Sequence, residues 1–451
     1  MDTNDSGRRE YRHKRRITNQ ILCWVGLVVM ICVLGVAAYI VADNVGKMLE
    51  KKPVAAQEPD NTVVSADSVS EDNAGEEESM VITAPEPIDE IVEETAPEEP
   101  EEPEEDPEIA ALLDGMSLEQ KIDGLFLVSP EAITGVATAT MAGDGTREAI
   151  SQFAIGGMVY TAKNVVASDQ FRELVATTKD MYHEVYNRDM LVFIDEEGKY
   201  SAIAGKAEEA DPQPSAKELA ETGNRENVTE SYEIIAEYLI GFGIDGDLAP
   251  QAAVLTAENS FLGERVFSDD ADIAASMTAA AVEGLKNGGV LSCLAAFPGE
   301  GGAVSDPDNA AISTDKSTEE LAECEYKPFI SGIEAGADMI MVSNIVASNA
   351  GSGDASCTLS EEIVTNLIRN ELGFEGVVIS APLDQVACTS SATPGAAALK
   401  AFIAGADMIY VRSTIAFNEA RTALLGAVED GTISEELVDT ALKRIYTMKL
   451  K

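Results

Sequence analysis

The sequence predicts an α/β protein, a (β/α)8 TIM-type barrel, for residues 109–451. Eight short apolar runs alternate with longer segments of helical period, which is the pattern of parallel strands joined by helices. Several of the helical segments open with an acidic or hydroxyl residue followed by Glu, a typical start of a helix. Eight strand–helix units suit a closed barrel better than an open doubly wound sheet, and one core is sufficient for a chain of this size.

Two segments with different properties open the chain. Residues 1–20 form a basic segment with a cluster of Arg and Lys, and residues 21–42 are apolar and uncharged. About twenty-two residues in a helix span roughly 33 Å, enough to cross a bilayer. The basic flank predicts a cytoplasmic N-terminus and a barrel outside the cell membrane. We expect a single uncleaved anchor. The alternative is a cleavable signal peptide, for which residues 40–42 are a poor cleavage site.

Residues 43–108 are predicted to be a disordered acidic linker. From position 53 onward this segment is dominated by Glu, Asp, Pro, Ser and Ala, and it contains no Lys or Arg. Few apolar side chains and strong self-repulsion leave little to offset the entropy of ordering. The whole chain has a formal net charge of −49. Because such a surface repels phosphate backbones, nucleic acid is not an expected partner.

The barrel elements follow in chain order. The expected strands are 124–129, 156–161, 190–195, 244–250, 289–297, 337–344, 376–381 and 406–412. Helices are expected, among others, over 227–242, 269–287, 318–335, 360–372 and 434–450. In a barrel of this type the loops after the strands form the active face. Functional residues are therefore expected after Ile194, Leu248, Phe297, Val342, Ile379 and Val411.

Cysteine and histidine are sparse. Cys23 and Cys32 lie in the apolar N-terminal segment, and His13 and His183 are the only histidines. We expect His183, which precedes the third strand, to be a surface or packing residue. The other cysteines lack the spacing of a metal site and are expected to be small buried residues, with a disulfide as the alternative: Cys293, Cys324, Cys357 and Cys388. No zinc cluster and no phosphate-binding loop is present, so neither a metal nor a cofactor is predicted.

A family resemblance covers nearly all of residues 109–451. The segments "MSLEQKIDGLFLV", "IGGMVY", "FIDEEG", "GIDGDLAP", "FLGERVFSDD", "FPGEGG", "GADMIMVSN" and "GFEGVVIS" occur in the order and at the spacing of one family. Together they resemble the N-terminal barrel domain of glycoside hydrolase family 3, especially the single-domain bacterial β-N-acetylhexosaminidases of cell-wall recycling. The resemblance implies a retaining mechanism. In it an Asp after the seventh strand attacks the sugar, and a His after the fifth strand, held by an Asp, serves as acid and base.

The residues that carry this chemistry in the family are largely replaced here. The resemblance places Ala381 at the nucleophile position, and a methyl group cannot attack a carbon. The sugar-binding Lys-His pair before Phe-Pro-Gly corresponds to Ala295 and Ala296. In the acid/base dyad Asp306 keeps the position of the orienting Asp, whereas Asp308 stands where the His would be. Losing a nucleophile or its partner typically costs several orders of magnitude in rate.

Other family positions are retained or altered. Asp195 matches the Asp that opens the family's Asp-Gln-Glu-Gly-Gly-Arg motif, but Lys199 and Tyr200 stand where Gly and Arg would be. Arg265 is retained, and Glu300 replaces the His of Gly-His-Gly. The candidates for binding substrate are therefore Asp195, Arg265, Glu300, Asp306 and Asp308. Each also has an ordinary structural explanation, such as capping a turn, forming an ion pair or being solvated in an acidic loop.

Three hypotheses for the function remain open. The first is a membrane-anchored pseudoenzyme that binds cell-wall glycan or muropeptides. The second is an active glycosidase, of the β-N-acetylhexosaminidase or β-glucosidase type, that uses relocated carboxylates. Its candidate acids are Glu196, Glu197, Glu300, Asp306, Asp308 and Asp384. The third is an interaction protein that binds other proteins of the cell envelope, with basic partners favoured by the acidic surface.

Overall fold

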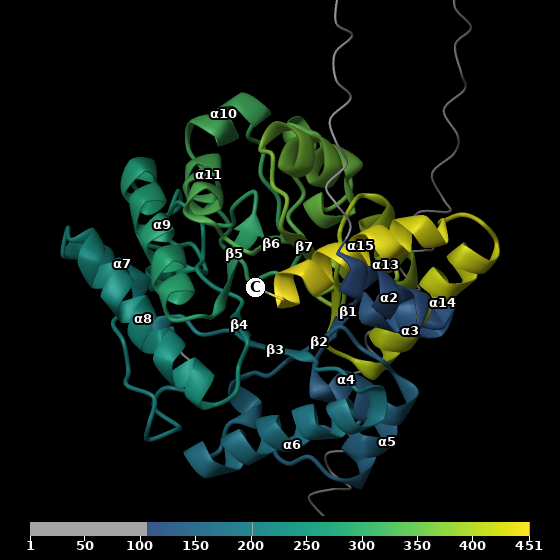
Figure 1. Cartoon of the computed structure of the whole chain (residues 1–451). Coiled ribbons are helices and arrows are strands. Elements are labelled where there is room, and N and C mark those ends of the chain that lie inside the picture. The colour runs from purple at the N-terminus through teal and green to yellow at the C-terminus, as the bar shows by residue number, and fades with distance from the viewer. Residues whose placement is uncertain (1–105, 201, 451) are drawn as a thin grey trace, which may run out of the picture. The chain divides into compact units, whose positions relative to one another are not determined.

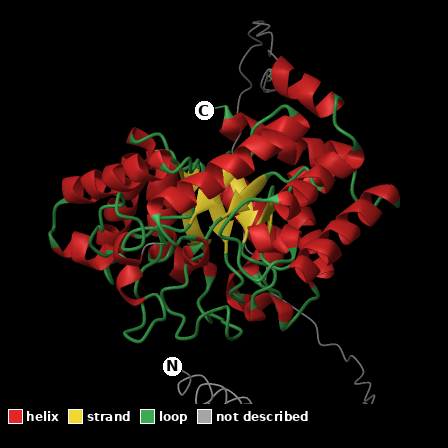
Figure 2. Ribbon diagram, turned by 90° about the horizontal axis from the view of Figure 1, so that it is seen from below, coloured by secondary structure: helices red, strands yellow, loops and turns green. Residues whose placement is uncertain are grey.

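Eight parallel strands close into a barrel in the computed structural model, which describes residues 106–200 and 202–450. The strands are hydrogen-bonded in the order β7-β6-β5-β4-β3-β2-β1-β8. A bridge between Ile379 and Met408 joins β7 to β8, and the Ser380 amide donates to the Met408 carbonyl at 2.9 Å. The predicted barrel is therefore confirmed, with its strands at the centre and its helices outside (Figures 1 and 2).

Each expected run contains one strand. The strands are β1 (Phe126–Val128), β2 (Gly157–Val159), β3 (Leu191–Ile194), β4 (Gly246–Asp247), β5 (Leu291–Phe297), β6 (Met339–Val342), β7 (Val377–Ser380) and β8 (Ile409–Val411). β4 is much shorter than the predicted run 244–250. Pro250 has no N–H to donate, so the regular ladder cannot continue through that end of the run.

The helices form the outer layer. They are α2 (Pro107–Asp114), α3 (Leu118–Gly124), α4 (Pro130–Thr134), α5 (Asp144–Gln152), α6 (Ser168–Tyr186), α7 (Ala216–Glu221), α8 (Arg225–Gly241), α9 (Ala271–Asn287), α10 (Thr318–Glu323), α11 (Tyr326–Ala335), α12 (Val386–Thr389), α13 (Pro394–Ile403), α14 (Thr414–Glu429) and α15 (Glu435–Lys449). Short 3-10 turns are η1 (Ala162–Asn164), η2 (Gly198–Tyr200), η3 (Gly263–Arg265), η4 (Ser348–Ala350) and η5 (Cys357–Leu359), and η6 (Glu362–Glu371) is a π-helix.

Helix α9 shows how the sequence specifies this layer. The Asp270 side chain accepts from the amides of Asp272 and Ile273, which satisfies donors at the helix start. α9 packs between α8 and α11. At Gly284 a Cβ atom would lie 2.5 Å from the Thr229 carbonyl oxygen, so only glycine permits the close approach of α9 to α8. The amphipathic period predicted for 269–287 is thus confirmed as a helix against the barrel.

One predicted helix is divided in two. The expected helix 318–335 ends at Glu323 and begins again at Tyr326. Pro328 lies in the first turn of α11, where its missing N–H has no helical partner to lose. A continuous helix would place the same proline in the interior, where it would clash with the preceding turn. The prediction of one helix was wrong for that reason.

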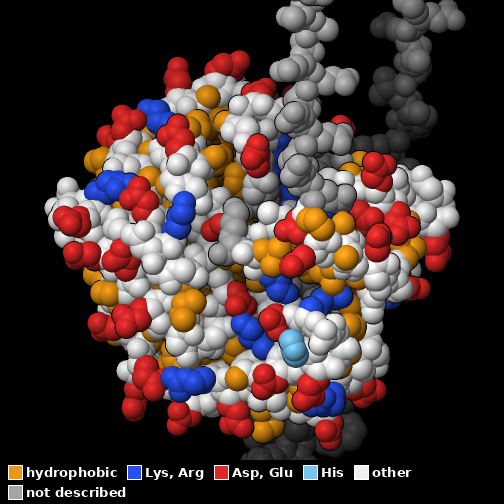
Figure 3. All heavy atoms as spheres, in the orientation of Figure 1, with side chains coloured by type: hydrophobic (Ala, Val, Ile, Leu, Met, Phe, Trp, Pro, Cys, Tyr) orange, Lys and Arg blue, Asp and Glu red, His pale blue; other side chains and the backbone are white. Residues whose placement is uncertain are grey.

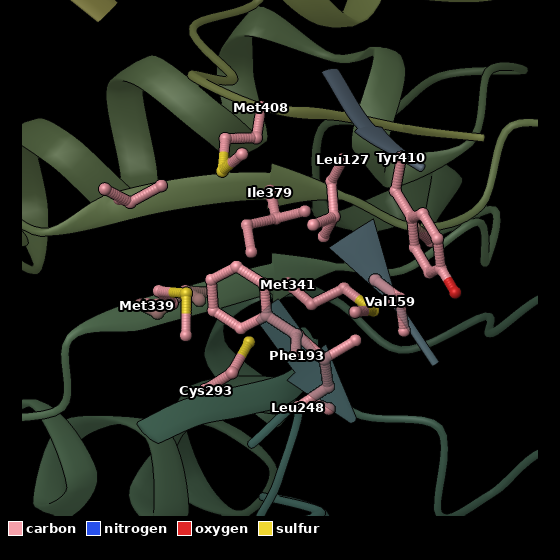
Figure 4. Packing of buried hydrophobic residues seen from close by; sticks show 14 of the residues in the cluster. Leu127, Val159, Phe193, Leu248, Cys293, Met339, Met341, Ile379, Met408 and Tyr410 are labelled. Atoms are coloured by element: carbon pink, nitrogen blue, oxygen red, sulfur yellow. The ribbon is translucent and has the colours of Figure 1, made fainter. Parts of the chain in front are cut away.

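The inside of the barrel is filled by side chains from every strand or strand end. Figure 4 shows part of this packing, in which buried residues from opposite sides of the barrel meet: Leu127, Val159, Phe193, Leu248, Cys293, Met339, Met341, Ile379, Met408 and Tyr410. Such interdigitated layers make the barrel a packed core and not a channel. A ligand must therefore bind at an end of the barrel.

The predictions for 1–20, for 21–42 and for the linker up to position 105 lie outside the described residues. The first described helix, α2, begins at Pro107, near the expected start of the globular part. Among the helices of residues 106–200 and 202–450, none combines the length and apolar character needed to cross a bilayer. Acidic side chains are spread over the face shown in Figure 3, with Lys and Arg between them.

Candidate active site

A cavity of about 240 Å³ lies at the carboxyl ends of the strands. It brings together side chains from loops that are far apart in the sequence. The candidate substrate-binding residues and the three alanines at altered family positions all line it: Asp195, Arg265, Ala295, Ala296, Glu300, Asp306, Asp308 and Ala381. The position agrees with the active face expected of a barrel. The cavity is therefore the candidate active site.

Three alanines form part of its wall. Ala381 follows β7, and its amide donates to the Val342 carbonyl at 2.8 Å, which holds its backbone against β6. Ala295 and Ala296 lie on β5, where the pairing with β6 shifts register between Leu294 and Phe297. Bulges of this kind often re-aim side chains beside active sites. Here the side chains at the bulge and after β7 are methyl groups, so these positions offer no acid, base or nucleophile.

Glu197 holds Arg265 through two hydrogen bonds. Arg265 Nη2 donates to Glu197 Oε1 at 2.8 Å, and Arg265 Nε donates to Glu197 Oε2. Gln251 Nε2 also donates to Glu197 Oε1, at 2.8 Å. Glu197 is buried, so this bidentate pair is shielded from water. The positive charge of Arg265 is thus largely compensated before any ligand arrives.

Asp195 lies beside this pair, close enough for its carboxyl group to interact with that of Glu197. Its Oδ2 is 3.9 Å from Arg265 Nη2, beyond hydrogen-bond distance. About half of its side chain (50%) is exposed, and the residue lines the cavity. Burial among protein atoms and the neighbouring charge of Glu197 raise the pKa of Asp195 to about 7, against the opposing effect of Arg265. Asp195 can therefore gain or lose a proton near neutral pH.

Glu300 is a second carboxyl group that can gain or lose a proton near neutral pH. It is 7% exposed, and its Oε1 accepts a hydrogen bond from the Ser343 hydroxyl. Burial raises the pKa of Glu300 to about 7, although the Ser343 hydrogen bond and Arg265 act in the opposite direction. The following residue, Gly301, fits closely against the chain: a Cβ atom there would lie 1.8 Å from the Val254 carbonyl oxygen. Only glycine allows the loop to place Glu300 in the cavity.

Several acids that could have replaced the nucleophile have structural partners. Glu196 is buried and accepts from the Tyr238 hydroxyl at 2.7 Å and from the Ile203 amide at 3.0 Å. Asp384 is bound to Arg412, with 3.1 Å between Oδ1 and Nε. Glu196 and Asp384 do not line the cavity. Asp384, one of the candidate acids for hydrolysis, is thus bound to an arginine and does not line the cavity.

Arg412 is a site residue that sequence reasoning missed. It follows β8 directly and donates to Asp308 through Nη1 at 2.9 Å and Nη2 at 2.7 Å. Arg412 therefore links the loops after β5, β7 and β8 at the mouth of the cavity. The available signal was its position directly after Val411, where functional residues were expected. Asp306 remains exposed, and its Oδ1 accepts from the Asp308 amide at 2.8 Å.

The remaining titratable residues lie elsewhere. His183 is an exposed residue of α6, with Nδ1 2.8 Å from Asp189 Oδ1, so it lies on the surface as expected. The cysteines of the described residues are free thiols, which answers the open question of a disulfide among them. Within 106–200 and 202–450, the His, Cys, Asp and Glu side chains form no cluster that could hold a metal ion.

Comparison with known proteins agrees with this geometry. Residues 117–448 match the glycosyl hydrolase family 3 N-terminal domain. The chain is 28% identical over 276 residues to a β-hexosaminidase of Xanthomonas oryzae, covering 59% of this chain and 78% of that protein. It is 26% identical over 327 residues to β-hexosaminidase A of Pseudoalteromonas piscicida, covering 67% of this chain and 54% of that protein.

Solved structures show the same fold. A family 3 β-N-acetylglucosaminidase from a Paenibacillus species has a TM-score of 0.70 and 28% identity, covering 74% of this chain and 62% of that one. A β-N-acetylhexosaminidase from Beutenbergia cavernae has a TM-score of 0.67 at 24% identity, with 74% of this chain and 99% of that chain covered. With its barrel, its cavity and a family match over most of its length, the chain belongs to glycosyl hydrolase family 3.

Proposed function

We propose that this protein binds a sugar of the cell-wall glycan in the cavity and does not form the covalent glycosyl-enzyme of a retaining glycosidase. The observation that carries the proposal is Ala381, which lines the cavity directly after β7. A retaining mechanism needs a carboxylate nucleophile about 5–5.5 Å from the acid. A methyl group at the end of β7 cannot supply that carboxylate.

The cavity retains groups suited to holding a sugar. Asp195, Arg265 and Glu300 reach it from three separate loops, and carboxylate and guanidinium groups are good partners for sugar hydroxyls. Its volume of about 240 Å³ is smaller than the 300–1,000 Å³ typical of sites for drug-sized ligands. It suits a single sugar ring at the end of a chain.

The proposed location follows from the sequence of residues 1–108. The basic segment, the apolar segment and the acidic linker support a single-pass anchor in the cell membrane with the barrel outside. There the barrel would meet cell-wall glycan or muropeptides. A role in binding envelope proteins is part of the same proposal, because an acidic surface favours basic partners.

Hydrolysis of O-glycosyl bonds is the second candidate function. It is favoured by two carboxyl groups in one cavity, Asp195 and Glu300, whose pKa values are both raised to about 7. One could donate a proton while the other activates water, as in an inverting glycosidase. The names of the relatives, β-hexosaminidases, also favour this candidate. The alanines on β5 and directly after β7 favour the first candidate, sugar binding without hydrolysis.

An assay of the full-length protein in detergent separates the two. Chromogenic N-acetylglucosaminide and glucoside substrates test turnover, and melting temperature in the presence of sugars and muropeptides tests binding. Turnover that is lost in both Asp195→Asn and Glu300→Gln, but kept in the surface control Glu436→Gln, would establish hydrolysis. A raised melting temperature without turnover is the result we expect. If no sugar is hydrolysed and none shifts the melting temperature, binding to envelope proteins is the proposed role that remains.

A further inference from the structure

The cavity contains more acidic than basic side chains. Four carboxyl groups and two guanidinium groups line it, and the acids are Asp195, Glu300, Asp306 and Asp308. Both arginines are also paired with carboxylates outside the lining. Arg265 is bound bidentately by Glu197, and Arg412 is bound by Asp384 in addition to Asp308. The arginines therefore leave part of the negative charge of the cavity uncompensated.

Glu300 is the acid with the strongest need of a partner. It is 7% exposed and lines the cavity, yet only its Oε1 accepts a hydrogen bond from a described residue, Ser343. Asp195 is more open: half of its side chain (50%) is exposed, and its Oδ2 lies 3.9 Å from Arg265 Nη2, beyond hydrogen-bond distance. A buried carboxylate without a full set of donors is costly unless a cation or donor reaches it. Glu300 is such a group, and it lines the cavity together with the more exposed Asp195.

The charged and titratable groups around Asp195 and Glu300 come from every neighbouring loop. They are Glu196 and Glu197 after β3, Tyr232 on α8, Asp247 on β4, Arg265 before α9, Cys293 on β5, Asp306 and Asp308 after β5, Cys357 after β6, Asp384 after β7, and Tyr410 and Arg412 on and after β8. The acids in this set outnumber the two arginines. No other cation from the described residues lines the cavity.

We propose that the cavity prefers a sugar with a positively charged amine, such as a glucosaminide without its N-acetyl group, to an N-acetylated or carboxylate-bearing sugar. This inference rests on the sugar-binding function proposed above. An ammonium group is a compact cation with three donors, and it can satisfy Glu300 and Asp195 while reducing the excess negative charge. An acetamido group carries no charge, and the carboxylate of a muramic acid residue adds to the repulsion.

Protons provide a second signature of this preference. Carboxyl groups with pKa values of about 7 are partly protonated at neutral pH. A bound cation favours their ionised form, so the complex should release protons to the buffer. A neutral sugar does not favour that form and should release none. Proton release therefore distinguishes charge recognition from a general fit of the sugar ring.

Isothermal titration of the full-length protein in detergent tests the proposal. The probes are methyl β-D-glucosaminide, its N-acetylated counterpart and N-acetylmuramic acid, at pH 7 and low salt, in two buffers of different ionisation enthalpy. We expect the free amine to bind at least about tenfold more tightly than the N-acetylated sugar, with proton release, and to weaken as salt is added. Glu300→Gln and Asp195→Asn should each reduce the preference, whereas Glu436→Gln should keep it.

The outcomes separate this inference from the proposed function. Equal or tighter binding of the N-acetylated sugar, or of N-acetylmuramic acid, would overturn the amine preference and leave sugar binding standing. Tight binding of the free amine without proton release, unchanged in both carboxyl variants, would also overturn it. Failure of all three sugars to bind would contradict the proposed function itself, and this inference with it.

Discussion

Arg412 and Asp308 are joined by two parallel hydrogen bonds, of 2.9 Å from Nη1 and 2.7 Å from Nη2, although they are 104 residues apart in the chain. Arg412 also contacts Asp384, at 3.1 Å from Nε. A planar guanidinium group suits such a bidentate contact better than an ammonium group would. The loop after β5 is thereby held against the loops after β7 and β8.

Replacing this arginine should loosen the loop. In Arg412→Gln we expect faster amide hydrogen exchange over residues 302–310, because the loop loses its ionic contact with β8. The free energy of unfolding should fall by only about 1 kcal/mol, since the arginine and Asp308 side chains are 30% and 42% exposed. The matched control is Arg147→Gln, whose ion pair with Glu184 is also exposed and lies between α5 and α6. Unchanged exchange in the loop would show that the contact does not hold it.

The buried pair of Glu197 and Arg265 should contribute much more. Arg265→Met leaves the Glu197 carboxylate, 3% exposed, without its cation, and should lower the free energy of unfolding by about 3 kcal/mol. Urea denaturation at pH 7 measures the change. Lys199→Met, which removes an exposed ion pair with Glu264, should change it by less than about 1 kcal/mol. Equal effects of the two variants would mean that the cavity pair is no stronger than a surface pair.

Glu300 should make stability depend on pH. Its pKa is raised from 4.5 to about 7 in the folded protein, so the folded state keeps a proton that the unfolded chain has lost. Stability from this group is therefore lost as pH rises from about 4.5 to 7. Glu300→Gln has no such proton, so its stability relative to wild type should increase by roughly 1–3 kcal/mol between pH 4 and pH 8. Thermal unfolding across that range, with Glu436→Gln as control, measures the trend, and a flat difference would contradict it.

Restoring a carboxylate after β7 should not be sufficient for catalysis. In Ala381→Asp we expect no turnover of chromogenic N-acetylglucosaminide, because Ala295 and Ala296 line the cavity without a polar group that could bind the sugar. The added charge joins an acidic cavity, so this variant should be less stable than Ala381→Asn at pH 8. The two should be similar at low pH, where the new carboxyl is protonated. Turnover with this single change would refute the proposal that catalysis is lost at several positions.

The cysteines should differ in reactivity. Cys324 is half-buried, whereas Cys293, Cys357 and Cys388 are buried. Burial raises the pKa of the Cys357 and Cys388 thiols to about 12, so little thiolate is present at pH 8. Peptide-resolved mass spectrometry after alkylation should find Cys324 modified first and the other three only after denaturation. Rapid labelling of Cys388 in the native protein would show that its surroundings open readily.

The barrel could be predicted from the sequence because each strand is a short apolar run that can be recognised from its own residues. Turns and helix starts are also local, and the runs around Ile194 and Ile379 carry their own signal. The break near Pro328 could not be read from helical period alone, since apolar residues continue on both sides of it. There the backbone of proline, and not hydrophobicity, decides where the helix begins.

The site was predictable only in part. The family resemblance placed Ala381 at the nucleophile position, and the structure places this residue in the cavity. Glu196 and Glu197 are adjacent in sequence, yet one turns to Tyr238 and the other to Arg265. No sequence pattern distinguishes these two orientations, because the partners come from distant elements. The same is true of Arg412, whose partner Asp308 lies on another loop.

Helix α15 packs at the end of the barrel opposite the cavity, so the two ends of the barrel differ. Arg444 of α15 donates to Asp407, which precedes β8, at 2.9 Å, and α15 also contacts α2 (Figure 1). The polypeptide thus enters the domain at Pro107 beside the amino ends of the strands, while the cavity opens beyond their carboxyl ends. The start of the globular part and the ligand-binding cavity therefore lie at opposite ends of the barrel.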